Sequence, residues 1–365
     1  MEEKRRRTCR WDGPIVTPSQ EFFFDDSLLS LVETIRLTLG DQVLEDGVVL
    51  RDAVGRLAFI APVQSESEEK REEVIRELRK VLGPYAREDR LLVFSDDPGA
   101  ERLLADPSRL PIQVEDVFCQ LIDRRIVGAG WLDEPRKEAT SPPRIVFASL
   151  KGGVGRSTAI AIAAADLARR NKNVLVIDLD LEAPGLGVLL LDEPRMPRFG
   201  TVDFLVENGI GGVDDRLLDD FVGTSTLTTA EGGRVDVVPA FGSRAMWKPE
   251  NILPKLARAM IDDIGEDGES TSLSSQIATM IERLTARNSY DVVLIDSRAG
   301  LAELAAPAVL GLGAAVLLFG TAQNQTIQGY RALFAALKLL AQRDRAAGRE
   351  ADWRLMFKSV YAKQS

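Results

Sequence analysis

The sequence predicts an α/β protein with a mostly parallel, doubly wound sheet, preceded by a small α/β domain. Three observations carry this prediction. From Arg144 onward, strand-like apolar runs alternate with helix-like runs, the pattern of a parallel sheet covered on both faces. A glycine-rich loop joins the first of these strands to the first helix. A polar, proline-rich segment at 132–143, which we interpret as a linker, separates residues 144–365 from residues 1–131.

Residues 1–131 alternate short helical and strand patterns, which indicates a small α/β domain. Residues 1–20 show no periodicity and are interpreted as a flexible lead-in. The further predicted elements are a helix at 22–39, strands at 47–50 and 57–63, a helix at 67–82, a strand at 90–94 and a helix at 112–126. The last helix is predicted from apolar residues spaced for one buried face, namely Val114, Val117, Phe118, Leu121 and Ile122.

The N-terminal domain contains no motif that indicates chemistry. Its charge run at 65–71 is interpreted as a solvated helix face, with a surface for a protein partner as the alternative. We expect this domain to carry the contact with a partner protein, which the sequence does not identify.

Residues 144–365 continue the alternation to the end of the chain. Strands are predicted at 144–149, 174–178, 234–239, 291–296, 314–319 and 353–360, and helices at 157–170, 201–208, 251–263, 272–287 and 326–345. The uncharged stretch 304–320 resembles a membrane span in hydropathy. It is short for a span and is interrupted by Pro307, Gly311 and Gly313, so a buried helix-turn-strand is the better interpretation.

Composition excludes several classes of function. The chain has 365 residues, of which 45% are hydrophobic, enough for a sizeable core and two domains. A net charge of −10 indicates no basic face for nucleic acid, and no apolar run follows the charged start, so it does not resemble a signal peptide. Two distant cysteines favour a reducing compartment, so we expect a cytoplasmic protein. Histidine is absent, which excludes a histidine general base and the commonest zinc ligands.

The loop after the first strand of the larger domain is Lys151-Gly152-Gly153-Val154-Gly155-Arg156-Ser157-Thr158. Its three glycines have no Cβ to block close approach, so consecutive backbone N–H groups can point at an anion on the positive end of the following helix. We predict that these eight residues bind the phosphates of a nucleotide. A tight turn without a ligand is the alternative.

The loop departs from the ordinary P-loop pattern, G-x-x-x-x-G-K-[ST], at Leu150 and Arg156. It resembles instead the pattern K-G-G-x-G-K-[ST], the deviant Walker A loop of the ParA/MinD class of P-loop ATPases. Lys151 takes the place of the additional lysine at the start of that loop.

Two later segments strengthen this resemblance. The strand at 174–178 ends in Asp178 and is followed by Asp180, similar to the D-x-D of the same class. The strand at 291–296 ends in Asp296, and Gly300 completes a pattern that resembles the D-x-x-x-G switch. The resemblance covers about residues 144–361 and implies the ParA/MinD-like P-loop fold.

The resemblance implies that the protein binds ATP with Mg²⁺ and hydrolyses it. Backbone N–H groups of residues 153–156 are then expected at the β-phosphate, and the Arg156 side chain supplies a cation. Ser157 is implied as a Mg²⁺ ligand, while Asp296 holds the ion through its water shell. Asp180 takes the catalytic position that orients the attacking water, and Asp178 supports the site.

An ATP-dependent homodimer is also implied by the resemblance. Lys151 would then be a second catalytic residue that reaches the partner's nucleotide, with a solvated lysine at the start of a loop as the alternative. Switch roles are implied for the residues that follow the strands, namely Asp178, Glu182, Gly185 and Gly300.

Arg156 is the departure with the largest consequence, because a planar guanidinium does not replace a compact ammonium at a tight phosphate site. We therefore expect a slow ATPase that works as a dimerisation switch and relays its nucleotide state to a partner. The alternative is a nucleotide-dependent binding module with negligible turnover. A looser resemblance links the loop and the motifs at Asp180 and Ile295 to MinD-like ATPases of bacterial signalling and conflict modules.

Three other classes on this fold do not match. Cluster-carrying reductases and arsenite pumps need cysteine sets, and tyrosine kinases need a terminal tyrosine cluster where this chain has Tyr361 alone. Only residues 362–365 follow the segment 353–361, where the class has its base-contacting segment. Three alternatives stay open: adenine recognition is incomplete, a partner supplies it, or the chain is truncated.

Overall fold

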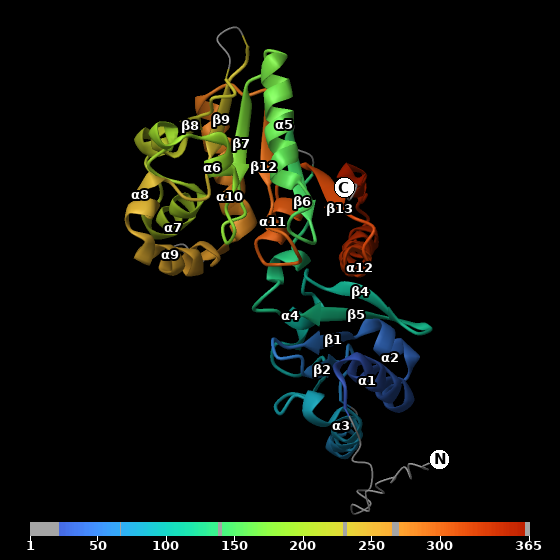
Figure 1. Cartoon of the computed structure of the whole chain (residues 1–365). Helices are drawn as coiled ribbons and strands as arrows, with labels where there is room; N and C mark the ends of the chain where they lie inside the picture. Colours follow the sequence, from blue (N-terminus) through green and yellow to red (C-terminus); the bar gives the residue numbers. More distant parts are fainter. Residues whose placement is uncertain (1–21, 66, 138–140, 229–231, 265–269, 362–365) are drawn as a thin grey trace, which may run out of the picture. The chain divides into compact units, whose positions relative to one another are not determined.

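A computed structural model describes residues 22–65, 67–137, 141–228, 232–264 and 270–361 (Figure 1). The predicted lead-in at 1–20 lies outside these described residues. The chain divides into two compact units, Met1–Asp123 and Arg124–Ser365, and each is described here by itself.

The first unit is a small α/β fold with a five-stranded sheet in the order β3-β2-β1-β5-β4. Its elements are α1 (Phe24–Leu39), α2 (Asp41–Asp46), β1 (Val48–Arg51), β2 (Leu57–Ile60), α3 (Glu68–Leu82), β3 (Leu92–Val93), α4 (Ala100–Leu104), β4 (Leu110–Val114) and β5 (Val117–Asp123). Strand β1 pairs in parallel with β5 and antiparallel with β2. The predicted helices at 22–39 and 67–82 and the first three predicted strands are confirmed within a few residues.

The helix predicted at 112–126 is wrong, because these residues form the antiparallel hairpin of β4 and β5. The apolar positions fit both a helical and an alternating pattern, and the side-chain burial follows the alternating one: Val117, Cys119 and Leu121 are buried while Phe118 is 60% exposed. A tight turn decides between them, since Glu115 adopts a positive φ of 51°, a conformation that ends a helix.

The second unit contains a seven-stranded sheet in the order β14-β13-β6-β12-β7-β9-β8. All its strand pairs are parallel except that of β8 with β9, so the predicted mostly parallel sheet is confirmed. The strands are β6 (Arg144–Ser149), β7 (Val174–Asp178), β8 (Gly223–Thr224), β9 (Val235–Val238), β12 (Val292–Asp296), β13 (Ala315–Gly320) and β14 (Phe357–Tyr361), with a separate short pair of β10 (Asp263–Ile264) and β11 (Ser270–Thr271).

The five helices predicted for this unit are confirmed, with shifted ends. They are α5 (Arg156–Arg169), α7 (Thr201–Gly211), α9 (Ile252–Ala259), α10 (Leu273–Arg287) and α12 (Asn324–Ala346). The sequence patterns did not predict the short helices α6 (Leu186–Leu190) and α8 (Ser243–Trp247) or the short strands β8, β10 and β11. These elements span too few residues to show a period.

Two apolar segments of the larger unit can be compared with their predicted structures. Residues 304–320 form α11 (Ala305–Leu310), a turn and β13, so the predicted helix-turn-strand is confirmed. The strand predicted at 353–360 begins later, at Phe357, after the 3-10 helix η6 (Asp352–Met356). The physical reason is Trp353, which is buried and donates its indole N–H to Asp344 Oδ2 at 2.8 Å, so the chain turns there before it extends.

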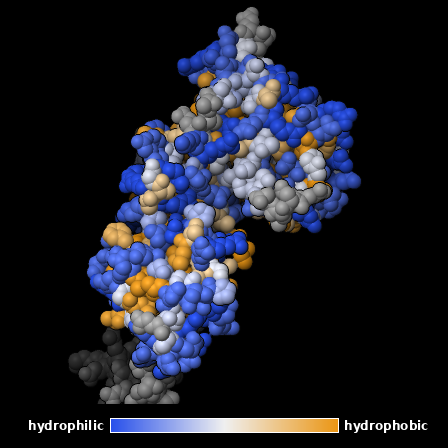
Figure 2. Space-filling view, turned by 180° about the vertical axis from the view of Figure 1, so that it is seen from behind, coloured by the Kyte–Doolittle hydropathy of each residue, from blue (hydrophilic) through white to orange (hydrophobic). Residues whose placement is uncertain are grey.

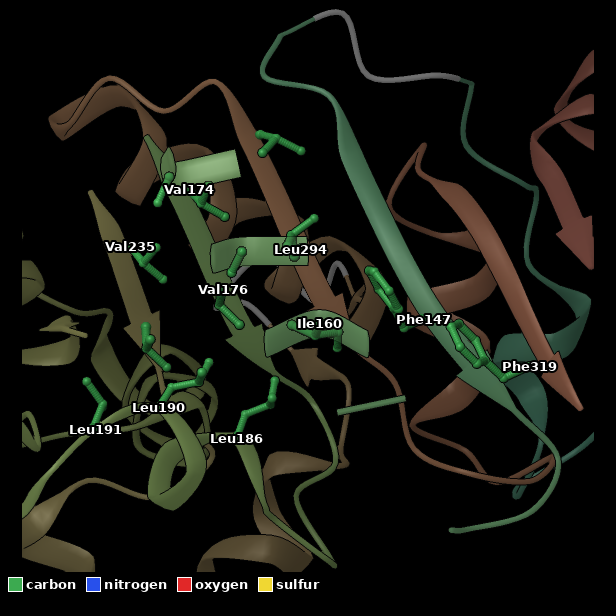
Figure 3. Close-up of a cluster of buried hydrophobic side chains, with 14 residues drawn as sticks. Phe147, Ile160, Val174, Val176, Leu186, Leu190, Leu191, Val235, Leu294 and Phe319 are labelled. Carbon is green, nitrogen blue, oxygen red and sulfur yellow. The ribbon is translucent and has the colours of Figure 1, made fainter. Parts of the chain in front are cut away.

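Helices cover both faces of the large sheet (Figure 1). Helix α5 and α6 lie on one face, where Ile160 packs among side chains of β6, β7 and β12 such as Phe147, Val176 and Leu294 (Figure 3). Ala164 and Ala168 on α5 are fully buried, and their small size lets this helix lie close to the sheet. The packing therefore fixes α5, and with it the loop that precedes it.

The division between the units falls after Asp123, whereas the sequence pattern placed the boundary at 131 and a linker at 132–143. The residues after Asp123 belong to the second unit and are bonded to other parts of it. Trp131 is buried and donates its indole N–H to Leu301 O at 3.2 Å, and Arg136 N donates to Leu310 O at 2.8 Å. These hydrogen bonds attach Trp131 and Arg136 to the larger unit. The interpretation of 132–143 as a linker stays a prediction, and residues 138–140 lie outside the described residues.

Within the part of the chain that the structure describes, no helix has the length and apolar character needed to cross a bilayer. The face drawn in Figure 2 is mainly hydrophilic, with apolar residues in separate patches.

Candidate functional site

Three neighbouring strands of the large sheet end in polar residues at the same edge. Strand β6 ends in Ser149, β7 in Asp178 and β12 in Asp296. The parallel register pairs Asp296 with Asp178, which brings the two carboxylates to the same level. Backbone hydrogen bonds join the segments beyond the strands, since Gly300 N donates to Ser149 O at 2.9 Å and Leu179 N donates to Asp296 O at 3.0 Å. The sheet therefore brings together residues that lie far apart in the sequence.

The glycine loop, residues 151–155, connects β6 to α5 above this edge. Gly153 and Gly155 have φ angles of 75° and 87°, a region that favours glycine. A Cβ added at Gly152, Gly153 or Gly155 would meet no atom within 4 Å, so the space beside the loop is open. No side chain caps the N-terminus of α5 at Gly155. The first N–H groups of α5 thus face a space in which an anion can bind.

Arg156 is the first residue of α5, and its side chain is buried beneath the loop, with 7% of the residue exposed. The guanidinium donates from Nη1 to Ser149 Oγ at 2.7 Å and from Nη2 to Asp180 Oδ2 at 3.1 Å. Its Nε lies 3.1 Å from Asp296 Oδ1. In this structure the predicted phosphate cation is therefore paired with the acidic residues of the site itself.

Ser157 and Asp296 form the pair predicted for the metal. Ser157 Oγ donates to Asp296 Oδ2 at 2.7 Å. Within the described part of the chain the buried Asp296 Oδ1 accepts no hydrogen bond, although Arg156 Nε is near. Burial raises the pKa of the Asp296 carboxyl, and the positive charge of Arg156 opposes this rise. A hydroxyl and a carboxylate with a free acceptor are oxygen ligands suited to Mg²⁺, so the residues fit the predicted ion.

Asp178 is fully buried and holds the chain that follows β7. Its carboxylate accepts hydrogen bonds from the backbone N–H groups of Asp180 at 3.0 Å, Gly185 at 3.2 Å and Leu186 at 3.1 Å. Burial, with the nearby charge of Asp296, raises the pKa of Asp178 to about 7 against the effect of these three bonds. The contacts fit the supporting role predicted for Asp178 and place Gly185 at the start of α6.

Asp180 is contacted by two arginines. Arg156 binds its Oδ2, and Arg298 Nη1 donates to its Oδ1 at 3.2 Å. Arg298 also pairs through Nη2 with Glu182 Oε2 at 2.6 Å. Sequence reasoning gave Arg298 no role, although its position between Asp296 and Gly300 in the second switch pattern was a usable signal.

Lys151 is exposed at the start of the loop, as is Thr158 at its end. Lys151 Nζ donates to Gln323 Oε1 at 3.0 Å, and Gln323 is the N-cap residue directly before α12. Ser149 Oγ donates to Lys151 O at 2.8 Å, which fixes the first turn of the loop. Gln323 was not predicted, and no pattern around it distinguishes it from other helix starts.

A largely apolar cavity of about 450 Å³ lies between α12 and the carboxyl ends of β13 and β14. Its lining includes Leu318, Ile327, Tyr330, Phe334 and Val360. Tyr330 contributes its ring to the wall while its hydroxyl donates to Phe319 O at 2.6 Å. The cavity has the apolar lining on which a planar base can pack.

The sheet, the open glycine loop and the acidic strand ends together define a nucleotide-binding α/β domain. The family model of the CobQ/CobB/MinD/ParA nucleotide binding domain matches residues 145–339, which is more than half of the chain. The chain therefore belongs to this family of nucleotide-binding ATPase domains, and the resemblance to the ParA/MinD class is confirmed. Membership of a signalling or conflict subgroup stays a prediction.

The solved structures to which this chain is similar are distant in sequence. A plasmid partition protein from Borrelia burgdorferi is 20% identical with a TM-score of 0.37, over 62% of this chain and 78% of that chain. The septum site-determining protein MinD from Pyrococcus horikoshii, complexed with Mg-ADP, is 21% identical with a TM-score of 0.37, over 57% and 67%. A cobyrinic acid a,c-diamide synthase from Mycobacterium smegmatis, with ADP and magnesium, is 20% identical with a TM-score of 0.37, over 54% and 69%. No curated protein matches the chain.

Proposed function

We propose that this protein binds and slowly hydrolyses Mg-ATP, dimerises when ATP is bound, and relays its nucleotide state to a partner protein through residues 1–131. The observation that carries the proposal is the meeting of an open, uncapped glycine loop with Arg156, Asp180 and the Ser157–Asp296 pair at one edge of the sheet. Each group needed for phosphoryl transfer is present within this edge.

Binding starts from the backbone of the loop. N–H groups of residues 153–156 hold the phosphates, because no side chain caps this helix end. Ser157 and Asp296 hold Mg²⁺, which when bound neutralises charge on the β- and γ-phosphate oxygens. Asp180 holds the attacking water by accepting its hydrogen bond. The apolar cavity beside Tyr330 supplies a surface for adenine.

Arg156 has to change partners during this binding. Its guanidinium pairs with Asp180 and Asp296 in the present structure, and both carboxylates are needed for water and metal. The phosphates attract the guanidinium, and its departure frees both carboxylates. Hydrolysis is therefore slowed by the internal pairing that has to be broken first.

Lys151 is the residue we propose for contact with the nucleotide of a second copy. Its ammonium is exposed and donates to the neutral amide oxygen of Gln323, so it is not held by a carboxylate there. An exposed cation next to the loop is available to phosphates from outside the chain. This supports an ATP-dependent homodimer.

A second candidate function is a nucleotide-dependent binding module with negligible turnover. The observation that favours it is the burial of Arg156 between Ser149, Asp180 and Asp296. If that pairing persists with nucleotide bound, Asp180 cannot orient a water. Steady-state release of phosphate from Mg-ATP by the full chain separates the two candidates.

The site is tested with Gly155→Val, measured by isothermal calorimetry with Mg-ATP. Valine places a branched side chain in the open space beside the loop, and Mg-ATP affinity should fall at least about tenfold. Gly348→Val is the matched control, because Gly348 also has a positive φ of 69° with open space around it, in the turn after α12. Unchanged affinity in Gly155→Val, or equal loss in both variants, contradicts the proposed site.

A further inference from the structure

Arg298 connects the two segments that follow β12 and β7. Its Nη1 binds Asp180 Oδ1 at 3.2 Å and its Nη2 binds Glu182 Oε2 at 2.6 Å. Its Nε is buried and donates no hydrogen bond within the described part of the chain. One guanidinium thus spans two carboxylates that lie two positions apart in the sequence, and it still has an unused donor at the site.

The two carboxylate oxygens of Asp180 bind two arginines that lie in different segments of the chain. Oδ2 binds Arg156, which belongs to the glycine loop and its helix, and Oδ1 binds Arg298, which belongs to the segment after β12. A phosphate in the loop competes for Arg156, since it lies next to that residue, while Arg298 keeps its link to Glu182. Asp180 then depends on Arg298 for its remaining cation.

We propose that Arg298 is a positioning residue that couples occupancy of the glycine loop to residues 180–191. This inference rests on the proposed nucleotide binding. When phosphates draw Arg156 away, Arg298 holds Asp180 in its orientation and carries the change to Glu182 and to the start of α6. The segment is suited to respond, because Val188 and Leu189 of α6 are exposed while Leu186 and Leu190 anchor it in the core.

A purely structural role does not account for the contact of Arg298 with Glu182. The side chain of Glu182 is 41% exposed, and ion pairs with exposed carboxylates add little to stability. Asp180 is additionally held by its backbone N–H bond to Asp178. Arg298→Gln should therefore fold, and its effect should appear in the response to nucleotide.

Hydrogen–deuterium exchange of the full chain, with and without Mg–AMP-PNP, is the deciding experiment. In the wild type, peptides covering residues 180–191 should become more protected when the nucleotide binds. Arg298→Gln should lose most of that change, while its affinity for Mg–AMP-PNP stays within about threefold of the wild type. Arg298→Lys should recover part of the change, because one ammonium can hold one of the two carboxylates at a time.

Arg287→Gln is the matched control, because Arg287 also pairs with a partly exposed carboxylate, that of Asp219, on the distant helix α10. It should respond to nucleotide as the wild type does.

A second comparison uses Glu182→Gln alone and combined with Arg298→Gln. If Arg298 acts through Glu182, the change in protection of residues 180–191 on nucleotide binding should be no smaller in the double variant than in Arg298→Gln.

The possible outcomes distinguish the proposed function from the proposed role of Arg298. A wild type that does not bind Mg–AMP-PNP overturns the proposed function and this inference together. A wild type that binds, with equal protection of residues 180–191 in Arg298→Gln, overturns the inference and leaves the function standing. Where the wild type turns over ATP, Arg298→Gln should also lower kcat about 10- to 100-fold with little change in KM.

Discussion

Arg156 shows how a single residue sets the character of the site. Lysine is a compact charge on a flexible stem, whereas the planar guanidinium donates to several acceptors at once. The structure uses this property, because Arg156 contacts Ser149, Asp180 and Asp296 together. Its sequence position indicated a cation for phosphates, and the three-way pairing could not be predicted from one residue identity.

Arg156→Lys should keep the ATP turnover level or raise it, by up to about tenfold, since an ammonium cannot hold all three partners and releases the carboxylates more easily. Steady-state phosphate release is the measurement. Arg287→Lys at the end of α10 is the matched control, because it makes the same substitution outside the glycine loop. A strong loss of turnover in Arg156→Lys would instead give the arginine a positive role at the γ-phosphate.

Asp178 makes the folded state sensitive to pH. Its pKa is raised to about 7 in the folded protein from 3.8, so between these values the native state binds a proton that the unfolded state lacks. Stability from this group is therefore highest at low pH and falls as pH rises toward 7. We expect a loss of about 3–4 kcal/mol between pH 4 and pH 8.

Urea unfolding at several pH values, compared between the wild type and Asp178→Asn, measures this effect. Asparagine does not titrate and still accepts backbone N–H bonds through one oxygen. The free energy of unfolding of Asp178→Asn should therefore fall less between pH 4 and pH 8 than that of the wild type. Equal slopes in both proteins would show that Asp178 keeps an ordinary pKa.

At the scale of elements, long periodic segments were predictable and short ones were not. The strand-loop-helix of β6, the glycine loop and α5 was predicted because each part has a distinct residue pattern. The β4–β5 hairpin was mistaken for a helix, since its apolar residues satisfy both periods and the turn has no glycine or proline. Tertiary packing against the small sheet decided what the local pattern left ambiguous.

The turn of this hairpin offers a direct test. Glu115 has a positive φ of 51°, which is strained for a residue with a Cβ. Glu115→Gly should raise the free energy of unfolding by about 0.5–1 kcal/mol, as measured by urea denaturation. Glu101→Gly, within the helix α4, should lower it by a similar amount. A destabilised Glu115→Gly would indicate that the hairpin turn is formed differently.

At the scale of the whole molecule, the fold class was predictable and the attachment of the central segment was not. Alternating patterns sufficed for the parallel sheet, because buried parallel strands read as apolar runs. The hydrogen bonds that join residues 124–136 to the larger unit depend on Leu301, Leu310 and neighbouring groups distant in sequence. The polar composition of 132–143 carried no information about those partners.

ATP-dependent dimerisation is the prediction that belongs to this scale. Lys151→Ala should bind Mg-ATP within about threefold of the wild type and stay monomeric, because the exposed cation at the loop start is gone. Asp180→Ala should bind, lose turnover and accumulate as dimer. Light scattering with and without Mg-ATP is the measurement. Monomer mass in every condition, wild type included, would contradict the switch and favour the static binding module.

The strand order has a consequence for how the chain folds. Strand β6, which leads into the glycine loop, pairs with β12 and β13, and β12 also separates it from β7. The first strand of the sheet therefore finds no neighbour until residues about 150 positions later have arrived, and such long-range closures make folding slow. During synthesis, the phosphate cradle is completed only when β12 and the segment up to Gly300 have been made, so nucleotide can assist folding only after that stage.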